Sequence, residues 1–230
     1  MLSIIVPTFN EKETLPLMME DVFGILKDAG IESEIIIVDD NSPDGTGDLA
    51  EELAKKFPVK VLHREGKFGL SSAVLTGFSR ASGEILMVTD ADGSHDYRII
   101  PEMVKAITDE GYELVVASRY MPGGGVTEWP MKRKIISWGA TTLGRLFTPI
   151  KDCVSGFFAF KREIISGVNI NPIGYKVGLE IFAKGKYTKS KEIPYIFNDR
   201  QIGESKLSNK EIIYYAQQIL SLLKYRIFGR

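Results

Sequence analysis

Short, largely apolar runs alternate along the chain with amphipathic stretches that have helical spacing. The runs cover residues 2–6, 35–38 and 85–88, and their length and abrupt ends are typical of buried strands. Between them lie the helical patterns of residues 13–28 and 48–57. Strands that alternate with helices in this way indicate a parallel, doubly wound sheet. The pattern therefore predicts an α/β fold with a mostly parallel sheet and flanking helices.

Polar, mainly acidic residues follow the predicted strands. Asp39 and Asp40 end the second strand, and Asp90 and Asp92 come just after the third. Right-handed crossovers place the carboxyl ends of parallel strands at one edge, where open α/β sheets bind ligands. Carboxylate oxygens suit a hard cation such as Mg²⁺ or Mn²⁺, shared with substrate phosphates. A polar turn is the alternative for Asp90 and Asp92, and the second acidic strand end favours a metal site.

The composition fits one large α/β domain. The chain has 230 residues, of which 44% are hydrophobic, and this is enough for a sizeable core. Its first residues are strand-like and lack a basic leader, so we expect no signal peptide. The single cysteine, Cys153, excludes an internal disulfide and suits a reducing compartment. The turn after the first strand lacks the glycines of a dinucleotide-binding motif, and no P-loop motif occurs.

The small net charge conceals two oppositely charged halves. Residues 1–115 carry 10 Lys and Arg against 22 Asp and Glu, whereas residues 116–230 carry 19 against 8. Such an asymmetry indicates different partners for the two halves. The acidic half fits a metal and a nucleotide, and the basic half requires an anion. Nucleic acid is disfavoured, because the acidic strand ends would repel its phosphates.

Two amphipathic segments lie in the basic half, at residues 129–147 and 208–230. In the second, Ser208 and Glu211 have the spacing of a capping box at a helix start. Each segment is either a helix packed on the sheet or a helix in a membrane interface, with its basic residues near the headgroups. Neither is a membrane span, because a span needs about 20 apolar residues and arginines or lysines interrupt both segments.

Eight motifs resemble those of family 2 glycosyltransferases with the GT-A fold. Several are similar to dolichol-phosphate mannose synthases in particular, and together they extend over nearly the whole chain. They begin at Pro7, Val38, Gly66, Asp90, Ser118, Trp129, Val154 and Gly203, in the order of the family.

The resemblance implies an inverting, metal-dependent transfer of mannose from GDP-mannose to dolichyl phosphate or another polyprenyl phosphate. The product would be a dolichyl β-mannosyl phosphate used for glycosylation, and the cofactor would be Mg²⁺ or Mn²⁺. A UDP-glucose-dependent dolichyl-phosphate glucosyltransferase is one alternative. A non-catalytic sugar-nucleotide-binding protein is another, although the basic acceptor residues favour catalysis.

The resemblance also implies roles for individual residues. Asp90 and Asp92 would bind the metal, with Ser94 as a third candidate where the family commonly has glutamine. Asp92, Arg119 and Arg200 would be catalytic. The acceptor phosphate site would comprise Arg119, Arg133 and Ser137. The nucleotide-sugar site would comprise Pro7, Phe9, Glu11, Val38, Asp40, Asp90, Ala91, Asp92, Arg119, Val177, Arg200 and Lys206.

We therefore expect a catalytic domain over residues 1–207 and an amphipathic helix over residues 208–230. A loop over residues 199–207 would carry Arg200 and Lys206 to the diphosphate and close over it. The expected partners are GDP-mannose, a polyprenyl phosphate and the membrane surface, with a separate membrane-anchoring protein as one route of attachment. The expected location is peripheral, at the cytoplasmic face of a membrane.

Overall fold

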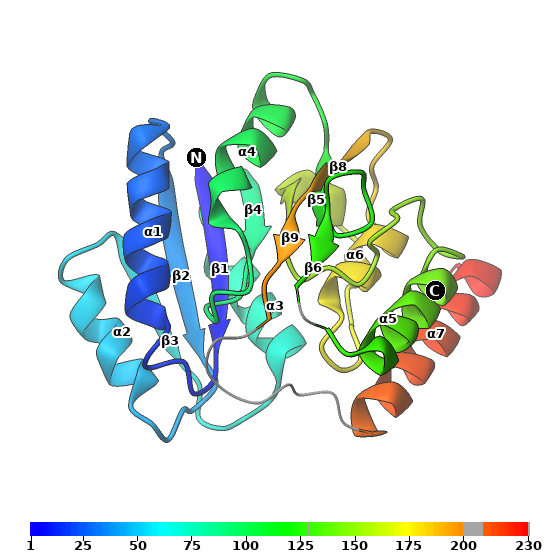
Figure 1. Cartoon of the computed structure of the whole chain (residues 1–230), viewed down its shortest axis with the longest axis horizontal. Coiled ribbons are helices and arrows are strands. Elements are labelled where there is room, and N and C mark those ends of the chain that lie inside the picture. Colours follow the sequence, from blue (N-terminus) through cyan, green and yellow to red (C-terminus); the bar gives the residue numbers. More distant parts are fainter. Residues whose placement is uncertain (128, 200–208, 230) are drawn as a thin grey trace.

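The computed structural model describes residues 1–127, 129–199 and 209–229 (Figure 1). The helices in this part of the chain are α1 (Leu15–Asp28), α2 (Thr46–Ala54), α3 (Leu70–Arg80), α4 (Ile100–Thr108), α5 (Met131–Gly144), α6 (Val177–Lys184) and α7 (Asn209–Phe228), with the short 3-10 helices η1 (Tyr97–Ile99) and η2 (Arg162–Ile165). The strands are β1 (Leu2–Thr8), β2 (Ser33–Asp39), β3 (Val59–His63), β4 (Ile85–Val88), β5 (Leu114–Ser118), β6 (Gly125–Val126), β7 (Phe158–Lys161), β8 (Ser190–Pro194) and β9 (Ile196–Phe197).

Seven of the described strands form one sheet in the order β3-β2-β1-β4-β7-β5-β8, and β6 pairs with β9 beside it. All neighbours in the large sheet are parallel except β7, which is antiparallel to both β4 and β5. The predicted mostly parallel sheet is confirmed. Because β1, β2, β4 and β5 run in the same direction, their carboxyl ends meet at one edge of the sheet (Figure 1).

Helices cover both faces of the sheet, and alternate residues of each strand face one layer or the other. In β1, Ile4 and Val6 pack in the core formed with α1, α2 and α4, whereas Ile5 packs in the core formed with α3, α6 and α7. All three are fully buried. This burial on both faces explains why the strands are short, continuous apolar runs in the sequence.

The second predicted helix is displaced from residues 48–57 to Thr46–Ala54. Its start is fixed by Gly45, whose φ of 85° lies in the left-handed region that favours glycine. Its end precedes Pro58, which disfavours helical backbone at Phe57. The first predicted helix begins at Leu15 instead of residue 13, with a proline in its first turn.

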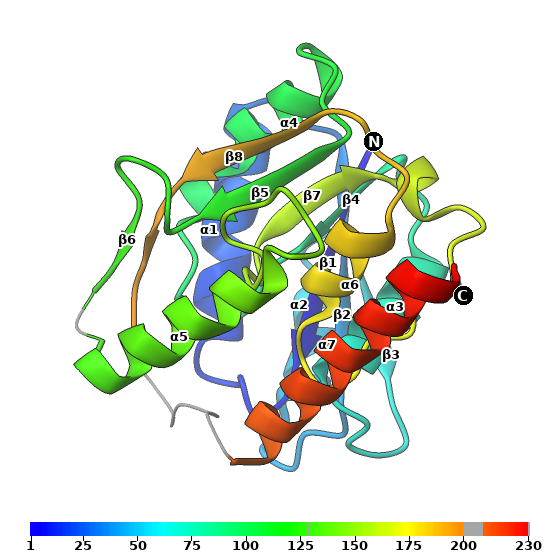
Figure 2. The same ribbon diagram turned by 90° about the vertical axis from the view of Figure 1, so that its right-hand side faces the viewer.

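The two amphipathic segments form α5 and α7, which lie side by side (Figure 2). The Tyr215 hydroxyl donates to Ala140 O at 2.5 Å and Arg226 Nη1 donates to Leu146 O at 2.5 Å, so α7 is tied to the last part of α5 and to the residues just after it. Among the described residues, no helix combines the length and the apolar character that crossing a bilayer requires.

Candidate active site

A cavity of about 860 Å³ opens at the edge where the carboxyl ends of the parallel strands meet. Its lining comes from the ends of β1, β2, β4 and β5, from the starts of α6 and α7 and from α5. The predicted site residues that line this cavity are Pro7, Phe9, Glu11, Asp40, Asp90, Ala91, Asp92, Arg119, Arg133, Ser137 and Val177.

Two of the predicted site residues that the structure describes do not line the cavity. Val38 is fully buried and packs in the core on the α3 face of the sheet. Ser94 is also fully buried and lies behind Asp92. Arg200 and Lys206 fall outside the described residues, so their predicted roles in the loop remain predictions.

Ser94 orients Asp92. Its hydroxyl and its backbone N–H both donate to Asp92 Oδ1, at 2.5 and 3.0 Å. The serine side chain is shorter than the family's glutamine, and its hydrogen is directed at the carboxylate and not at the cavity. Its part in the site is therefore to hold one carboxylate oxygen in place.

Two aromatic residues, Tyr97 and His95, contact Asp90. The Tyr97 hydroxyl donates to the backbone oxygen of Asp90 at 2.8 Å. Burial, together with the charges of Asp92 and Asp90, raises the pKa of this phenol, which keeps it a donor. The Thr89 hydroxyl and the Asp90 N–H both approach His95 Nδ1, so the ring hydrogen lies on Nε2, which faces Asp90 Oδ2 at 3.7 Å.

Glycine at position 156 keeps the space beside Asp90 open. A Cβ there would lie 3.6 Å from Asp90 Oδ2 and 3.8 Å from His95 Cε1, so a larger side chain would cover the carboxylate. The glycine in the motif that begins at Val154 thus has a steric explanation.

The donor set fits a hard divalent cation. Asp90 and Asp92 present carboxylate oxygens to an open cavity, which are the ligands that Mg²⁺ and Mn²⁺ favour. Within the described ranges, no group of three or more His, Cys, Asp or Glu side chains could enclose a metal. A site with two carboxylates suits an ion that completes its coordination with water and substrate phosphates.

The tips of β1 and β2 are linked in strained conformations. Asn10 and Asn41 have φ values of 61° and 60°, which are uncommon outside glycine. The Asn10 N–H donates to Ser42 Oγ at 3.0 Å. At the same tip, Glu11 Oε2 accepts from the Thr14 hydroxyl at 2.9 Å. This contact supports the helix start as well as placing Glu11 in the cavity wall.

Phe9 and Asp40 are held by the segment that precedes α3. Lys67 Nζ lies 3.6 Å from the centre of the Phe9 ring. Asp40 accepts from Arg64 Nη1 at 2.7 Å and from the backbone N–H groups of Phe68 and Gly69 at 3.1 and 2.7 Å. Asp40 therefore fastens this segment to β2 while it lines the cavity. Lys67 lies in a motif noted in the sequence, but its contact with Phe9 could not be seen there.

Arg119 forms a buried, two-pronged ion pair with Asp152. Arg119 Nε and Nη2 donate to the two carboxylate oxygens at 2.7 Å each. The backbone N–H of Arg119 also donates to Asp152 Oδ2, at 2.9 Å. The two side chains are 8% and 0% exposed. A guanidinium has five N–H donors, so three remain for an anion in the cavity. Asp152 carried no signal in the sequence, because 33 residues separate it from Arg119.

The other two predicted acceptor residues lie on α5. Arg133 Nη1 donates to Asp199 at 2.8 Å, and its guanidinium lies 4.0 Å from the centre of the Trp129 ring. Ser137 Oγ and the Tyr120 hydroxyl are 3.0 Å apart. The structure thus brings Arg119, Arg133 and Ser137 to the same cavity as the acidic pair.

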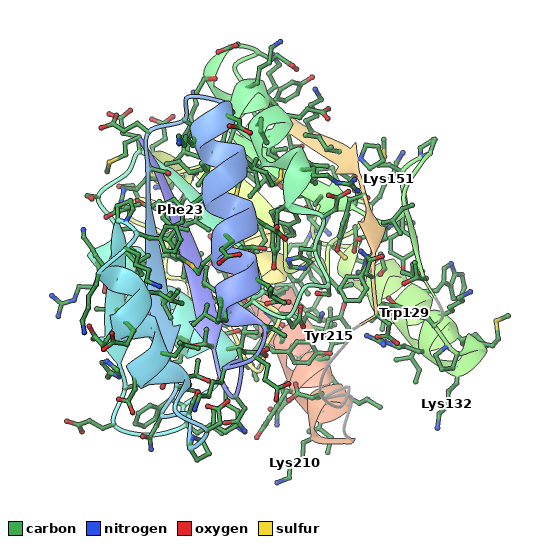
Figure 3. All side chains as sticks on the ribbon, turned by 60° about the vertical axis from the view of Figure 1, so that its left-hand side comes forward. Phe23, Trp129, Lys132, Lys151, Lys210 and Tyr215 are labelled. Carbon is green, nitrogen blue, oxygen red and sulfur yellow. The ribbon has the colours of Figure 1, made fainter. Side chains whose placement is uncertain are left out.

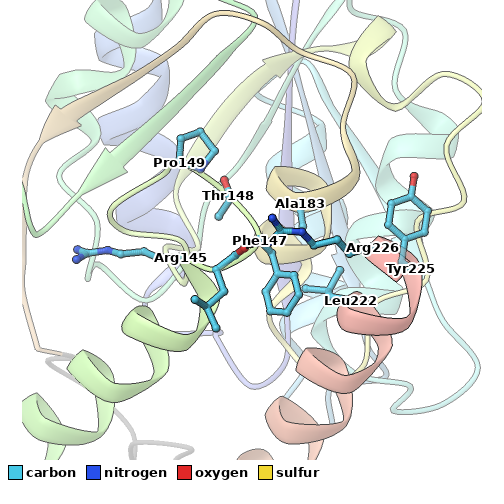
Figure 4. Close-up of a pocket in the computed structure, with 9 residues that line it drawn as sticks. Arg145, Phe147, Thr148, Pro149, Ala183, Leu222, Tyr225 and Arg226 are labelled. Atoms are coloured by element: carbon cyan, nitrogen blue, oxygen red, sulfur yellow. Dashed lines mark hydrogen bonds between the residues drawn. The ribbon is translucent and has the colours of Figure 1, made fainter. Parts of the chain in front are cut away.

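A second cavity, of about 500 Å³, lies where the end of α5 meets α6 and α7 (Figure 4). Its lining includes Phe147, Leu222 and Tyr225, and Arg145 points away from these side chains. None of the predicted site residues lines it. The larger cavity is therefore the candidate active site.

A mostly parallel sheet with an acidic strand end facing a basic helical wall defines a GT-A-like α/β protein. The model of the family described as "Glycosyl transferase family 2" matches residues 3–168. The chain belongs to glycosyl transferase family 2, as its motifs predicted.

Two similar proteins are named dolichol-phosphate mannosyltransferase. The one from Pyrococcus furiosus is 47% identical over 97% of this chain, and the chain spans 64% of its length. The one from Saccharomyces cerevisiae is 37% identical over 99% of this chain and 88% of its own. The predicted resemblance to this group is confirmed.

Solved structures agree on the fold. A mannosyltransferase from Pyrobaculum calidifontis, in complex with GDP-Man and Mn²⁺, has a TM-score of 0.67 and 21% identity. The match covers 98% of this chain and 64% of that one. At this level of identity the likeness concerns the fold alone, and it confirms the predicted GT-A class.

Proposed function

We propose that this protein transfers mannose from GDP-mannose to dolichyl phosphate or another polyprenyl phosphate. The observation that carries the proposal is the cavity itself, which is lined by two carboxylates at the end of β4 and by two arginines from β5 and α5. One wall suits a metal-bound diphosphate and the other suits a second phosphate. The names of the relatives from Pyrococcus furiosus and Saccharomyces cerevisiae support mannose and dolichyl phosphate.

On the donor side, Asp90 and Asp92 would hold Mg²⁺ or Mn²⁺. When bound, the cation neutralises charge that develops on the departing diphosphate. Phe9 would contact the base, and Glu11 and Asp40 would accept hydrogen bonds from the base or ribose. Because Asp40 is also held by Arg64, we propose that its orientation is fixed before the nucleotide binds. Val38 is buried, so a role there is confined to its backbone.

On the acceptor side, the nucleophile needs no strong base. A phosphate monoester has a second pKa of about 6, so its oxygen is largely ionised at neutral pH. Arg119 would bind this phosphate through the donors that Asp152 leaves over, and Arg133 and Ser137 would complete the site. Their work is to hold two anionic substrates together. Attack in line with the departing diphosphate would invert the anomeric carbon and yield a β-linked product.

The long lipid of the acceptor would reach this site along α5 and α7. Both helices expose large apolar side chains, namely Met131, Ile135, Trp138, Leu143, Ile212, Ile213, Leu220, Leu223, Ile227 and Phe228. Lys132 and Lys210, near the helix starts, point away from the body of the molecule on the same side (Figure 3). We propose that this surface rests in a membrane interface, with the lysines near anionic headgroups. Attachment at the cytoplasmic face, alone or with a membrane-anchoring partner, belongs to the same proposal.

A transfer assay tests the proposal. Labelled GDP-mannose and labelled UDP-glucose are each supplied with dolichyl phosphate and Mg²⁺ or Mn²⁺, and the lipid product is extracted. We expect metal-dependent mannosyl transfer that Asp92→Asn abolishes and that Asp28→Asn, at the exposed end of α1, leaves unchanged. Transfer from UDP-glucose but not from GDP-mannose would make the protein a glucosyltransferase and contradict the proposed donor. Nucleotide binding without transfer from either donor would contradict catalysis.

A further inference from the structure

Lys176 is a part-buried lysine that the roles above do not use. It immediately precedes α6, and its side chain lines the candidate active site. Its ammonium donates to the backbone oxygen of Val154 at 3.0 Å and lies 4.3 Å from the centre of the Tyr175 ring. Within the described part of the chain, this is the one hydrogen bond recorded for the ammonium. Since an ammonium has three N–H donors, two remain.

A buried lysine at the other end of α6 shows what such a group ordinarily requires. Lys184 forms an ion pair with Glu180, and the two side chains are 7% and 1% exposed. Among the described residues, no carboxylate forms an ion pair with Lys176, and Asp152 and Asp90 act on it only through space. A desolvated ammonium without a directly paired counter-ion is costly. The position of Lys176 in a cavity wall indicates that a ligand supplies the missing negative charge.

Lys176 lies close enough to Arg119 to feel its charge. Burial lowers the pKa of the Lys176 ammonium to about 8, the charge of Arg119 acts in the same direction, and the charges of Asp152 and Asp90 act in the opposite one. An anion between the two cations would favour both. The Lys176 backbone oxygen accepts from Gln218 Nε2 of α7 at 3.0 Å, so its position is tied to the helix with the exposed apolar face.

We propose that the Lys176 ammonium binds a phosphate oxygen of the lipid acceptor, together with Arg119. This inference rests on the proposed function, because it assigns a further residue to the same acceptor site. Lys176 holds the phosphate from the α6 side and Arg119 holds it from the end of β5. The phosphate oxygens would then accept from the N–H donors of the ammonium and the guanidinium that have no partner among the described residues.

Variants at this position separate the acceptor from the donor. In Lys176→Met, we expect the KM for a short-chain polyprenyl phosphate to rise about tenfold or more, as when a charge-assisted hydrogen bond is lost. The affinity for GDP-mannose with metal should stay within about twofold, because the inference assigns Lys176 to the acceptor phosphate and leaves the diphosphate to the metal. Lys176→Arg should restore most of the acceptor affinity, since it keeps the charge. Lys186→Met is the matched control, because its exposed ammonium donates to Ser166 O outside the cavity.

A measurement on the unaltered protein supplements the variants. Calorimetric titration with the short-chain polyprenyl phosphate at about pH 8.5, in buffers of different ionisation enthalpy, should show proton uptake, because the bound phosphate raises the pKa of Lys176. The phosphate itself is already a dianion there. Lys176→Met should abolish the uptake, which identifies its source. The charged and titratable groups that face the ammonium are Asp90, Arg119, Asp152, Cys153, Tyr175 and Glu211.

Two results with the Lys176→Met variant would overturn the inference. One is an unchanged acceptor KM in a folded Lys176→Met protein, and the other is a loss of GDP-mannose affinity with the acceptor KM intact. Absence of proton uptake by the unaltered protein would also contradict it. Failure of the proposed function looks different, because the unaltered protein would then transfer no sugar to any polyprenyl phosphate. If it also fails to bind the lipid phosphate, both proposals fall.

Discussion

The two walls of the cavity are built in different ways. The donor wall consists of strand ends joined by short, direct hydrogen bonds, so that Asp40 and Asp92 are held before any ligand arrives. The acceptor wall consists of the end of β5 and of α5, α6 and α7, and it contains the charged side chains of Arg119 and Lys176. The first wall has the fixed side chains that the proposed nucleotide and metal require. The second keeps unused donors for an anion, beside a surface of exposed apolar side chains.

The largest effect should come from the donor wall. Replacing Asp92 with Asn removes the charge of a proposed metal ligand but keeps the shape and the contact with Ser94. We expect kcat to fall about a thousandfold, which corresponds to about 4 kcal/mol of transition-state stabilisation. Initial rates over a range of Mg²⁺ and Mn²⁺ concentrations measure this. Full activity with full metal dependence would remove Asp92 from the site.

A stability effect should follow from Asp40, since it fastens the segment before α3. Asp40→Ala leaves Arg64 buried without its partner, and the pair is only 6–10% exposed. We expect the free energy of unfolding to fall by about 3 kcal/mol. Urea denaturation measures the loss, and calorimetry with GDP reports the accompanying loss of nucleotide affinity. An unchanged midpoint would contradict the bracing role, whereas unchanged GDP affinity would contradict the nucleotide role.

On the acceptor wall, Arg133→Lys keeps the charge but loses the planar fork. We expect the KM for polyprenyl phosphate to rise about tenfold while the affinity for GDP-mannose is maintained. Steady-state kinetics with each substrate varied in turn distinguish an effect on the acceptor from an effect on GDP-mannose. Lys134→Met, an exposed change one residue further along α5, is the control. Equal kinetics in Arg133→Lys and the parent protein would exclude Arg133 from the acceptor site.

The smallest effect should appear at the apolar surface. Trp138 on α5 is 63% exposed. Trp138→Ser should weaken binding to vesicles that contain anionic lipid about fivefold, because it removes apolar area from the interface. Leu17→Ser is the matched control, since Leu17 is 61% exposed on α1, far from α5 and α7 (Figure 1). Co-sedimentation with vesicles measures both. Equal losses in the two variants would show that this surface is not the membrane-binding one.

The two walls also differ in how far they could be predicted from the sequence. The first strands and the acidic pair follow from local patterns, because a buried strand is a continuous apolar run and its end is marked by polar residues. The pairing of Arg119 with Asp152 depends on packing between distant segments, and so does the burial of Lys176. Neither has a local signature. The positions of Val38 and Ser94 were missed for a related reason, since a motif does not show which side chains face the cavity.

The central claim is that one wall binds the nucleotide and the other the lipid phosphate. The most direct test is a pair of calorimetric titrations, with GDP plus Mg²⁺ and with a short-chain polyprenyl phosphate, on Asp92→Asn and Arg133→Lys. We expect Asp92→Asn to lose affinity for GDP and to retain the polyprenyl phosphate, and Arg133→Lys to show the reverse. Loss of both ligands in either folded variant, or of neither in both, would contradict the division of the site.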